Sequence, residues 1–206
     1  MRAFLGIDLP ENVREAMGAL QRQLAASAGH QRVRHSAATP MVAASAADVK
    51  WVSPAQLHVT LKFLDEISEA QRQAIEERVG QVVRREPSFR LGIEGVGAFP
   101  SINAPRVIWV GLSEGKECLA RLAASIEQAL ETLDVRKEER LFASHLTIGR
   151  VRSPQHLQAL VQRLREVAWQ PPAAWDVTSI TLYHSVLSSS GPRYTVLAIF
   201  PLSSRQ

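Results

Sequence analysis

The sequence predicts an α+β fold of two pseudo-symmetric lobes, each an antiparallel sheet with helices on its outer side, around a central cleft. Three observations lead to this prediction. Strand-like and helical patterns alternate along the 206 residues, the pattern H-x-T-x occurs twice, and a helical pattern follows each copy. Since 46% of the residues are hydrophobic, which is enough for a large core, we expect residues 1–206 to form a single bilobal domain.

The first half of the chain is predicted from its periodicity. Residues 3–9 are expected to form a strand, and Pro10 begins a helical pattern that runs to about residue 28. Residues 29–48 are rich in Ala and Ser and have no hydrophobic period, which predicts a flexible loop. Two short strands and a helix with Ser68 as its N-cap follow, at residues 49–52, 56–63 and 68–85.

The second half repeats the alternation and ends in a hairpin. A loop at residues 97–105, rich in Gly and Pro, is expected on the surface between two strands, at 89–96 and 106–112. Ser153-Pro154 has the pattern of an N-cap followed by the first residue of a helix. The remaining predicted segments are a helix at 116–133, a solvated charged connection at 136–140, the strand with the second H-x-T-x, a helix ending near 167, and hairpin strands at 179–187 and 194–202.

The two copies of H-x-T-x carry the groups with the clearest chemistry, His58-Val59-Thr60-Leu61 and His145-Leu146-Thr147-Ile148. Because side chains alternate between the faces of a strand, each copy places its imidazole and its hydroxyl on one face. Histidine has an unperturbed pKa of about 6.5, so two imidazoles facing one cleft can supply an acid and a base at neutral pH. Such a pair is what phosphodiester chemistry at neutral pH can use.

The composition is that of a basic protein without a disulfide framework. The net charge is +4, and arginine is more frequent than lysine, which suits a phosphate-bearing partner. Cys118 is the single cysteine, which excludes an intramolecular disulfide and a cysteine metal cluster. No apolar run has the length of a membrane span and the N-terminus lacks a signal-peptide pattern, so we expect a cytoplasmic protein that does not enter a membrane.

With these motifs the chain resembles the two-histidine phosphoesterase superfamily, and within it the RNA 2',3'-cyclic phosphodiesterases first named 2'-5' RNA ligases. The resemblance covers nearly the whole chain, through residues 2–10, 49–52, 57–64, 97–100, 106–112, 145–150, 182–185 and 191–194. The chain departs from the family in the stretch near 29–48, which is longer than expected. The resemblance implies hydrolysis of a terminal 2',3'-cyclic phosphate on RNA to a 2'-phosphate, with reversible 2'-5' ligation, and it implies no metal and no cofactor.

The roles of the two histidines follow from this reaction. Water attacks phosphorus in line with the departing ribose 3'-oxygen, so one group must accept a proton and another must donate one. The resemblance assigns the proton donor to His58 and the proton acceptor to His145. Ligation would reverse these roles.

Three further residues are candidates for binding the phosphate. Thr60 and Thr147 would donate hydrogen bonds to its nonbridging oxygens, although threonine is also common in strands for packing reasons. Arg150 is a candidate phosphate clamp, because a guanidinium group matches phosphate oxygens bidentately. Strict alternation puts Arg150 on the face opposite His145, so this role requires Gly149 to allow a bulge or a strand end.

The remaining polar and aromatic residues near the motifs have alternative interpretations. Lys62 shares the face of His58 and would either extend a positive cleft or be a solvated lysine. Candidate platforms for base stacking are Phe99, Trp51, Tyr183 and His184, with core packing favoured for Trp51 and Phe99.

Two other functions stay open from the residues alone. The same groups could open a small cyclic nucleotide phosphate, and a non-catalytic RNA-binding protein could use the strands to shape a basic groove. A metal-dependent phosphodiesterase is disfavoured because the histidines lack the clustered Asp and Glu ligands of a two-metal site. The expected partner is RNA with a 2',3'-cyclic phosphate end, such as a tRNA fragment. We expect a monomer, since no apolar stripe is left over.

Overall fold

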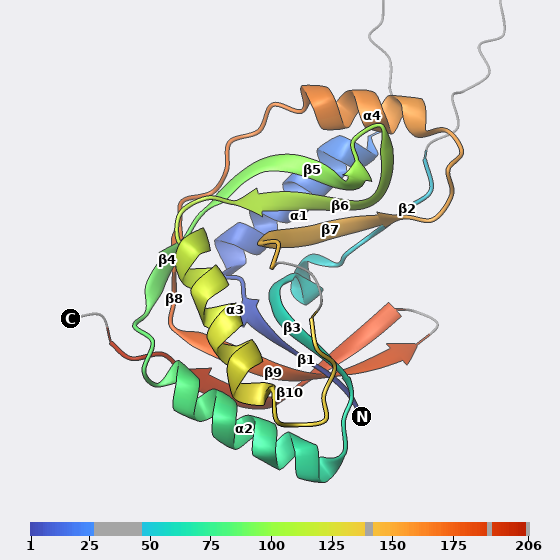
Figure 1. Ribbon diagram of the computed structural model, residues 1–206. Coiled ribbons are helices and arrows are strands. Elements are labelled where there is room, and N and C mark those ends of the chain that lie inside the picture. Colours follow the sequence, from blue (N-terminus) through green and yellow to red (C-terminus); the bar gives the residue numbers. More distant parts are fainter. Residues whose placement is uncertain (27–46, 139–141, 189–190, 205–206) are drawn as a thin grey trace, which may run out of the picture.

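The computed structural model describes residues 1–26, 47–138, 142–188 and 191–204. The predicted flexible loop at 29–48 lies outside the described residues, apart from its last two positions. Within the described parts, the α+β class, the two antiparallel sheets and the helices are confirmed (Figure 1).

Two four-stranded antiparallel sheets form the centre of the molecule. Sheet A has the strand order β10-β9-β1-β3, with bounds Gly191–Pro201, Ser179–Ser188, Arg2–Asp8 and His58–Glu66. Sheet B has the order β2-β7-β6-β5, with bounds Val49–Trp51, His145–Val151, Ala104–Leu112 and Ile93–Ser101. A short two-stranded sheet joins β4, Phe89–Leu91, to β8, Trp175–Val177. Each four-stranded sheet thus contains one of the H-x-T-x strands, β3 or β7.

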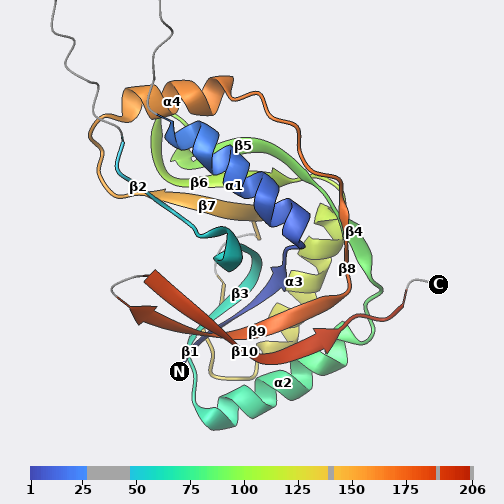
Figure 2. The ribbon, with the colours of Figure 1, turned by 180° about the vertical axis from the view of Figure 1, so that it is seen from behind.

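The helices cover the two sheets in an exchanged arrangement (Figures 1 and 2). Their bounds are Glu11–Ala25 for α1, Glu69–Val83 for α2, Lys116–Leu130 for α3 and Leu157–Glu166 for α4, with a 3-10 turn, η1, at Pro54–Gln56. Helix α1 follows a strand of sheet A but packs on β7 of sheet B, beside α4. Helix α3 follows a strand of sheet B but packs on β3 of sheet A, beside α2. Each half of the chain therefore helps to close the core of the other.

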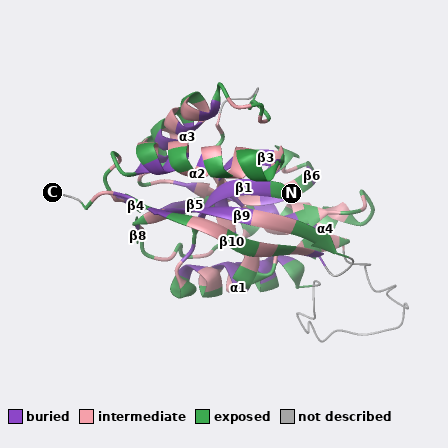
Figure 3. Ribbon diagram, turned by 90° about the horizontal axis from the view of Figure 1, so that it is seen from below, coloured by how far each residue is buried: buried purple, intermediate pink, exposed green. Residues whose placement is uncertain are grey.

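The helices form where their apolar faces and caps predict them. Ser68 caps α2 as expected, because its hydroxyl accepts from the backbone N–H of Gln71 while the Gln71 side chain accepts from the backbone N–H of Ser68. On α1 the buried aliphatic residues repeat every three or four positions, at Val13, Met17, Leu20 and Leu24. Figure 3 shows that buried residues gather on the inner strands and on the helix faces turned toward them.

Three predicted boundaries were wrong. The fourth helix begins at Leu157 rather than at Ser153-Pro154, because the Ser153 hydroxyl accepts from Gln155 N–H in a turn. The surface loop predicted at 97–105 is largely the β5–β6 hairpin, since β5 runs through Pro100 to Ser101. The single strand predicted at 89–96 is divided into β4 and β5, which pair with different partners. Strand β8, which has only three residues, was not predicted.

Candidate active site

The two H-x-T-x strands lie in different sheets and contact one another: β3 is an edge strand of sheet A, and β7 lies between β2 and β6 in sheet B. In sheet A, His58 lies opposite Asp8 of β1, and Thr60 lies opposite Gly6. In sheet B, His145 lies opposite Gly111 of β6, and Thr147 lies opposite Trp109. Two segments that are distant in the sequence therefore present the same pair of groups from neighbouring strands.

Each motif strand contains a bulge directly after its threonine. Leu61 has no partner on β1, because Thr60 pairs with Gly6 and Lys62 with Leu5. Ile148 likewise has no partner on β6, because Thr147 pairs with Trp109 and Gly149 with Ile108. An extra residue in one strand shifts the alternation of all later side chains by one position.

Because of the bulges, the third residue after each threonine points to the same side of the strand as the histidine and the threonine. Arg150 follows Thr147 by three positions and lines the same cavity, and Phe63 stands in the equivalent position after Thr60. The irregularity that Arg150 requires lies at Ile148, one residue before the predicted Gly149.

Helix α1 supplies a hydrogen-bond donor to the carbonyl of Ile148, the residue at the bulge in β7. The buried side-chain amide of Gln21 donates to the carbonyl of Ile148 at 2.8 Å and to the carbonyl of Val52 at 2.7 Å. The Val52 N–H donates to the Ile148 carbonyl as well, at 3.0 Å. The two donors satisfy both acceptor positions of this buried carbonyl at the bulge.

The two imidazoles are oriented by the same local contact. Nδ1 of His58 lies 2.8 Å from the carbonyl oxygen of Gln56, and Nδ1 of His145 lies 2.7 Å from that of Ala143. A carbonyl oxygen can only accept, so in both rings Nδ1 carries the proton and donates it. The Nε2 atom of each neutral ring is thereby left as the proton acceptor.

The surroundings of the two rings differ. The ring of His58 packs against Phe4, with centroids 4.6 Å apart, and against the edge of Tyr194 at 5.3 Å. Burial lowers the pKa of His58, and this effect outweighs the hydrogen bond to Gln56 and the charge of Asp8, which raise the pKa. The ring of His145 meets Phe99 edge to face at 5.2 Å. Asp8 and Arg14 are the charged groups whose fields act on His58.

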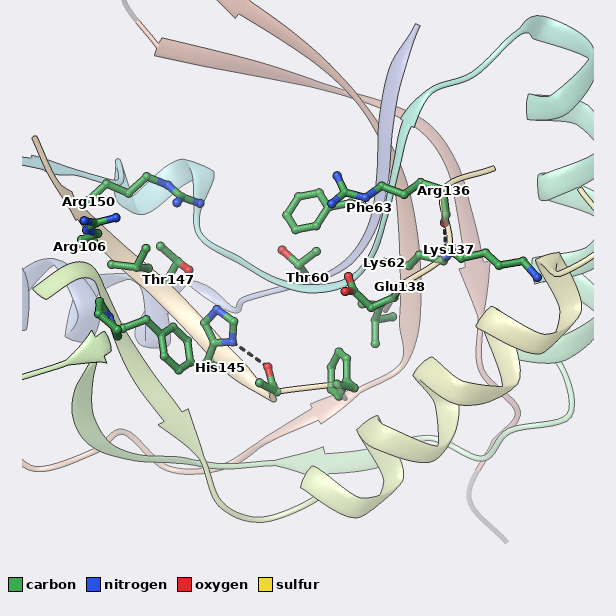
Figure 4. A pocket seen from close by; sticks show the side chains of 16 residues that line it. Thr60, Lys62, Phe63, Arg106, Arg136, Lys137, Glu138, His145, Thr147 and Arg150 are labelled. Atoms are coloured by element: carbon green, nitrogen blue, oxygen red, sulfur yellow. Dashed lines mark hydrogen bonds between the residues drawn. The ribbon is translucent and has the colours of Figure 1, made fainter. Parts of the chain in front are cut away.

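A cavity of about 1000 Å³ lies between the motif strands. Figure 4 shows Thr60, His145 and Thr147 near its middle, with Arg150 and Arg106 at one end and Arg136 and Lys137 at the other. Four of the five predicted site residues line it, namely Thr60, Thr147, His145 and Arg150. His58 is not among the lining residues, because its ring is enclosed by its aromatic neighbours.

Two charged residues beside His58, Asp8 and Arg14, were not predicted from the sequence. The Asp8 carboxylate accepts from the hydroxyl groups of Tyr183 and Thr181 and lies 3.3 Å from Arg14. The guanidinium group of Arg14 also donates to the carbonyls of Pro54 and Leu57, on either side of Gln56. The only sequence signal was a carboxylate at the end of an otherwise apolar strand.

Two interpretations of single residues change in the structure. Lys62 is not a solvated lysine: it is buried, pairs with Glu127 of α3, and donates to the Arg136 carbonyl at 2.8 Å. The prediction that Tyr183 is a platform for base stacking was wrong, because its ring is buried against Phe4 and its hydroxyl group donates to Asp8.

Of the other candidates, Trp51 packs on the core and Phe99 lies at the cavity. Trp51 packs over Gly149, as the core alternative predicted. Phe99 is exposed and lines the cavity, contrary to the core packing that the sequence favoured.

Within the described residues, no group of three or more His, Cys, Asp or Glu side chains could hold a metal ion. No helix in the same parts of the chain is long and apolar enough to cross a membrane.

The chain is similar to proteins of one family along almost its entire length. The model of the 2'-5' RNA ligase superfamily matches residues 20–187. The RNA 2',3'-cyclic phosphodiesterase of Archaeoglobus fulgidus is 33% identical over 200 residues, which are 97% of this chain and 99% of that protein. The RNA 2',3'-cyclic phosphodiesterase of Methanothermobacter thermautotrophicus is 31% identical and covers 98% of this chain and 99% of its own length.

Solved structures show the same similarity. The crystal structure of TT0787 from Thermus thermophilus matches with a TM-score of 0.73 and 28% identity over 100% of both chains. The crystal structure of E. coli LigT complexed with 3'-AMP matches with a TM-score of 0.69 and 25% identity, covering 98% of this chain and 97% of that chain.

Replacing Gln21 with Met tests the support of the β7 bulge. The variant keeps the length of the side chain but removes both hydrogen bonds, so we expect the free energy of unfolding to fall by about 1–3 kcal/mol. Gln23→Met, on the exposed face of the same helix, is the matched control and should change it by less than about 0.5 kcal/mol. Urea unfolding measures both, and equal losses in the two variants would contradict the role of Gln21.

Proposed function

We propose that this chain, which belongs to the 2'-5' RNA ligase superfamily, is an RNA 2',3'-cyclic phosphodiesterase that opens a terminal cyclic phosphate to a 2'-phosphate. One observation carries the proposal: two neighbouring strands each hold a histidine two residues before a threonine, and both threonines and His145 line one cavity, in a chain that matches relatives with this activity along nearly its full length. The proposed partners are RNA fragments, including tRNA fragments, that end in a cyclic phosphate.

In the proposed reaction, water attacks phosphorus from the side opposite the ribose 3'-oxygen. His145 accepts a proton from the water through Nε2, and His58 donates a proton to the departing 3'-oxygen. The hydrogen bonds from Nδ1 to the carbonyls of Ala143 and Gln56 support both roles, because they fix the rings with Nε2 as the exchanging atom. A 5'-hydroxyl group that attacked the same cyclic phosphate in place of water would form a 2'-5' bond and release the 3'-oxygen with the two histidines in these same roles. Only the reverse reaction, attack of the 3'-hydroxyl on the 2'-5' bond, would exchange the roles.

The negative charge of the pentavalent transition state needs stabilisation by fixed donors. We assign this role to the hydroxyl groups of Thr60 and Thr147 and to the guanidinium group of Arg150, which line the cavity together. The two threonines come from different sheets, so the phosphate would be held from two sides. Arg150 adds a positive charge beside the two hydroxyl groups.

The buried setting of His58 has a consequence for its role as proton donor. Burial disfavours the imidazolium form, while the nearby Asp8 carboxylate favours it. A bound phosphate anion would favour the imidazolium further. His58 is therefore expected to be charged more readily in the complex than in the free protein.

The reaction is tested with a short RNA that ends in a 2',3'-cyclic phosphate, in the presence of a chelator. We expect the wild type to produce the 2'-phosphate without a metal, and we expect His58→Ala and His145→Ala to lower kcat/KM by about 10²–10⁴-fold each, since each removes one proton-transfer group. Product analysis by chromatography against 2'- and 3'-phosphate standards identifies the bond that breaks.

His156→Ala, which removes an exposed imidazole at the start of α4, is the control and should retain wild-type turnover. No turnover by folded wild type that still binds RNA would favour a binding protein instead. Turnover that survives loss of either motif histidine would exclude the proposed mechanism.

The pH profile of kcat/KM should be bell-shaped, because one histidine must be protonated and the other neutral. The pKa of His58 is lowered in the free protein, so as proton donor His58 should place the alkaline limb below about pH 6.5. Asp8→Asn removes a charge that raises this pKa and should move the alkaline limb to still lower pH. A shift of the acidic limb instead would mean that His58 is the proton acceptor.

A further inference from the structure

The two ends of the cavity differ in how their positive charges are balanced. At the end that includes Arg136 and Lys137, each cation has a carboxylate partner: Arg136 lies 2.8 Å from Asp65, and Lys137 lies 3.4 Å from Glu131. Glu138 lines this end as well. The field at this end is therefore largely neutralised.

The opposite end has three cations on three neighbouring strands. Arg106 of β6 and Arg150 of β7 line the cavity there, as Figure 4 shows. Lys50 of β2 lies directly opposite Arg150 in the β2–β7 register, and Val107, next to Arg106, lies opposite Arg150 on its other side. We call Lys50, Arg150 and Arg106 the basic row. Among the described residues, no carboxylate forms an ion pair with any of the three.

This arrangement costs stability in the absence of an anion. Like charges directly opposite one another on neighbouring strands repel, and a sheet normally separates them or places an acid between them. Adjacent strands are about 4.8 Å apart, so the long side chains of Lys50 and Arg106 both reach the surroundings of Arg150. All three side chains are exposed, so an anion can approach them.

We propose that Lys50 and Arg106 bind a second phosphate of the substrate, the phosphodiester that joins the terminal nucleotide to the rest of the RNA. Arg150, in the motif strand with Thr147, binds the reacting phosphate. Lys50 and Arg106 bind the next phosphate along the RNA. The inference rests on the proposed function and specifies its substrate: an oligonucleotide with a cyclic phosphate end is preferred over a cyclic mononucleotide, which has no second phosphate.

The volume and shape of the site agree with this assignment. A cavity of about 1000 Å³ stands at the upper end of the range for small-ligand pockets, so it has room for more than the terminal nucleotide. Nζ of Lys50, from sheet B, lies beside Gly191 of β10, from sheet A, and the Gln56 side chain donates to the carbonyl of Pro192. The basic row thus extends to the place where the two sheets meet.

The test compares two substrates that differ in phosphate number, adenosine 2',3'-cyclic monophosphate and the trinucleotide ApApA ending in the same cyclic phosphate. For wild type, Lys50→Gln and Arg106→Gln, kcat/KM is measured for each substrate at several salt concentrations. Arg85→Gln, which removes the same charge from the exposed turn that follows α2, is the control.

We expect the wild type to prefer the trinucleotide. Either substitution in the basic row should lower the ratio of trinucleotide to mononucleotide kcat/KM about tenfold, the scale of one charge-assisted hydrogen bond. The slope of log kcat/KM against log salt for the trinucleotide should also become shallower by about 0.7 per lost contact. Lys50→Gln should not lower the unfolding temperature, because it relieves the repulsion with Arg150.

The outcomes separate this inference from the function on which it rests. If the wild type opens neither substrate, the proposed function is wrong. If it opens both equally well, or if the basic-row variants lose activity toward both substrates in proportion, the second phosphate site does not exist. A ratio that falls as far in Arg85→Gln as in the basic-row variants would point to overall charge rather than to a site.

Discussion

A buried peptide carbonyl needs a hydrogen-bond donor, and the geometry of this protein depends on how that need is met at Ile148, where β7 bulges away from β6. The bulge at Ile148 turns Arg150 back to the side of His145 and Thr147. The Ile148 carbonyl accepts from the Val52 N–H and also from Gln21, a residue of a helix in the other half of the chain. The position of a charged group beside the cavity is thus coupled to the packing of α1 on sheet B.

The histidines are oriented by contacts that are more local. Each ring donates to the carbonyl two residues before it, so its tautomer is set by the segment directly before the strand. The residues that surround the two rings differ. His58 has a carboxylate and an arginine beneath it, whereas His145 stands beside the open cavity with an aromatic edge against it. A duplicated motif therefore provides two imidazoles with unlike surroundings, which acid–base chemistry requires.

The sequence was sufficient for the features that depend on periodicity. Alternation placed Thr60 with His58 and Thr147 with His145, and apolar spacing with a cap located α2 to within two residues at either end. The sequence was insufficient where a single unpaired residue shifts the alternation of side chains along a strand. The position of Arg150 depends on an unpaired Ile148, and nothing in the local composition distinguishes Ile148 from the aliphatic residue at any other strand position. The burial of Lys62 depends on Glu127, which is 65 residues away in the chain.

The exchange of α1 and α3 between the sheets has a mechanical consequence. A pair of domains joined by a linker can open like a hinge, because few contacts cross the boundary. Here α1 leaves sheet A to cover sheet B, and α3 leaves sheet B to cover sheet A, so any separation of the two walls would pull a helix off a hydrophobic core. The two walls of the cavity share one hydrophobic core, and the packing of both helices opposes a hinge-like opening between them.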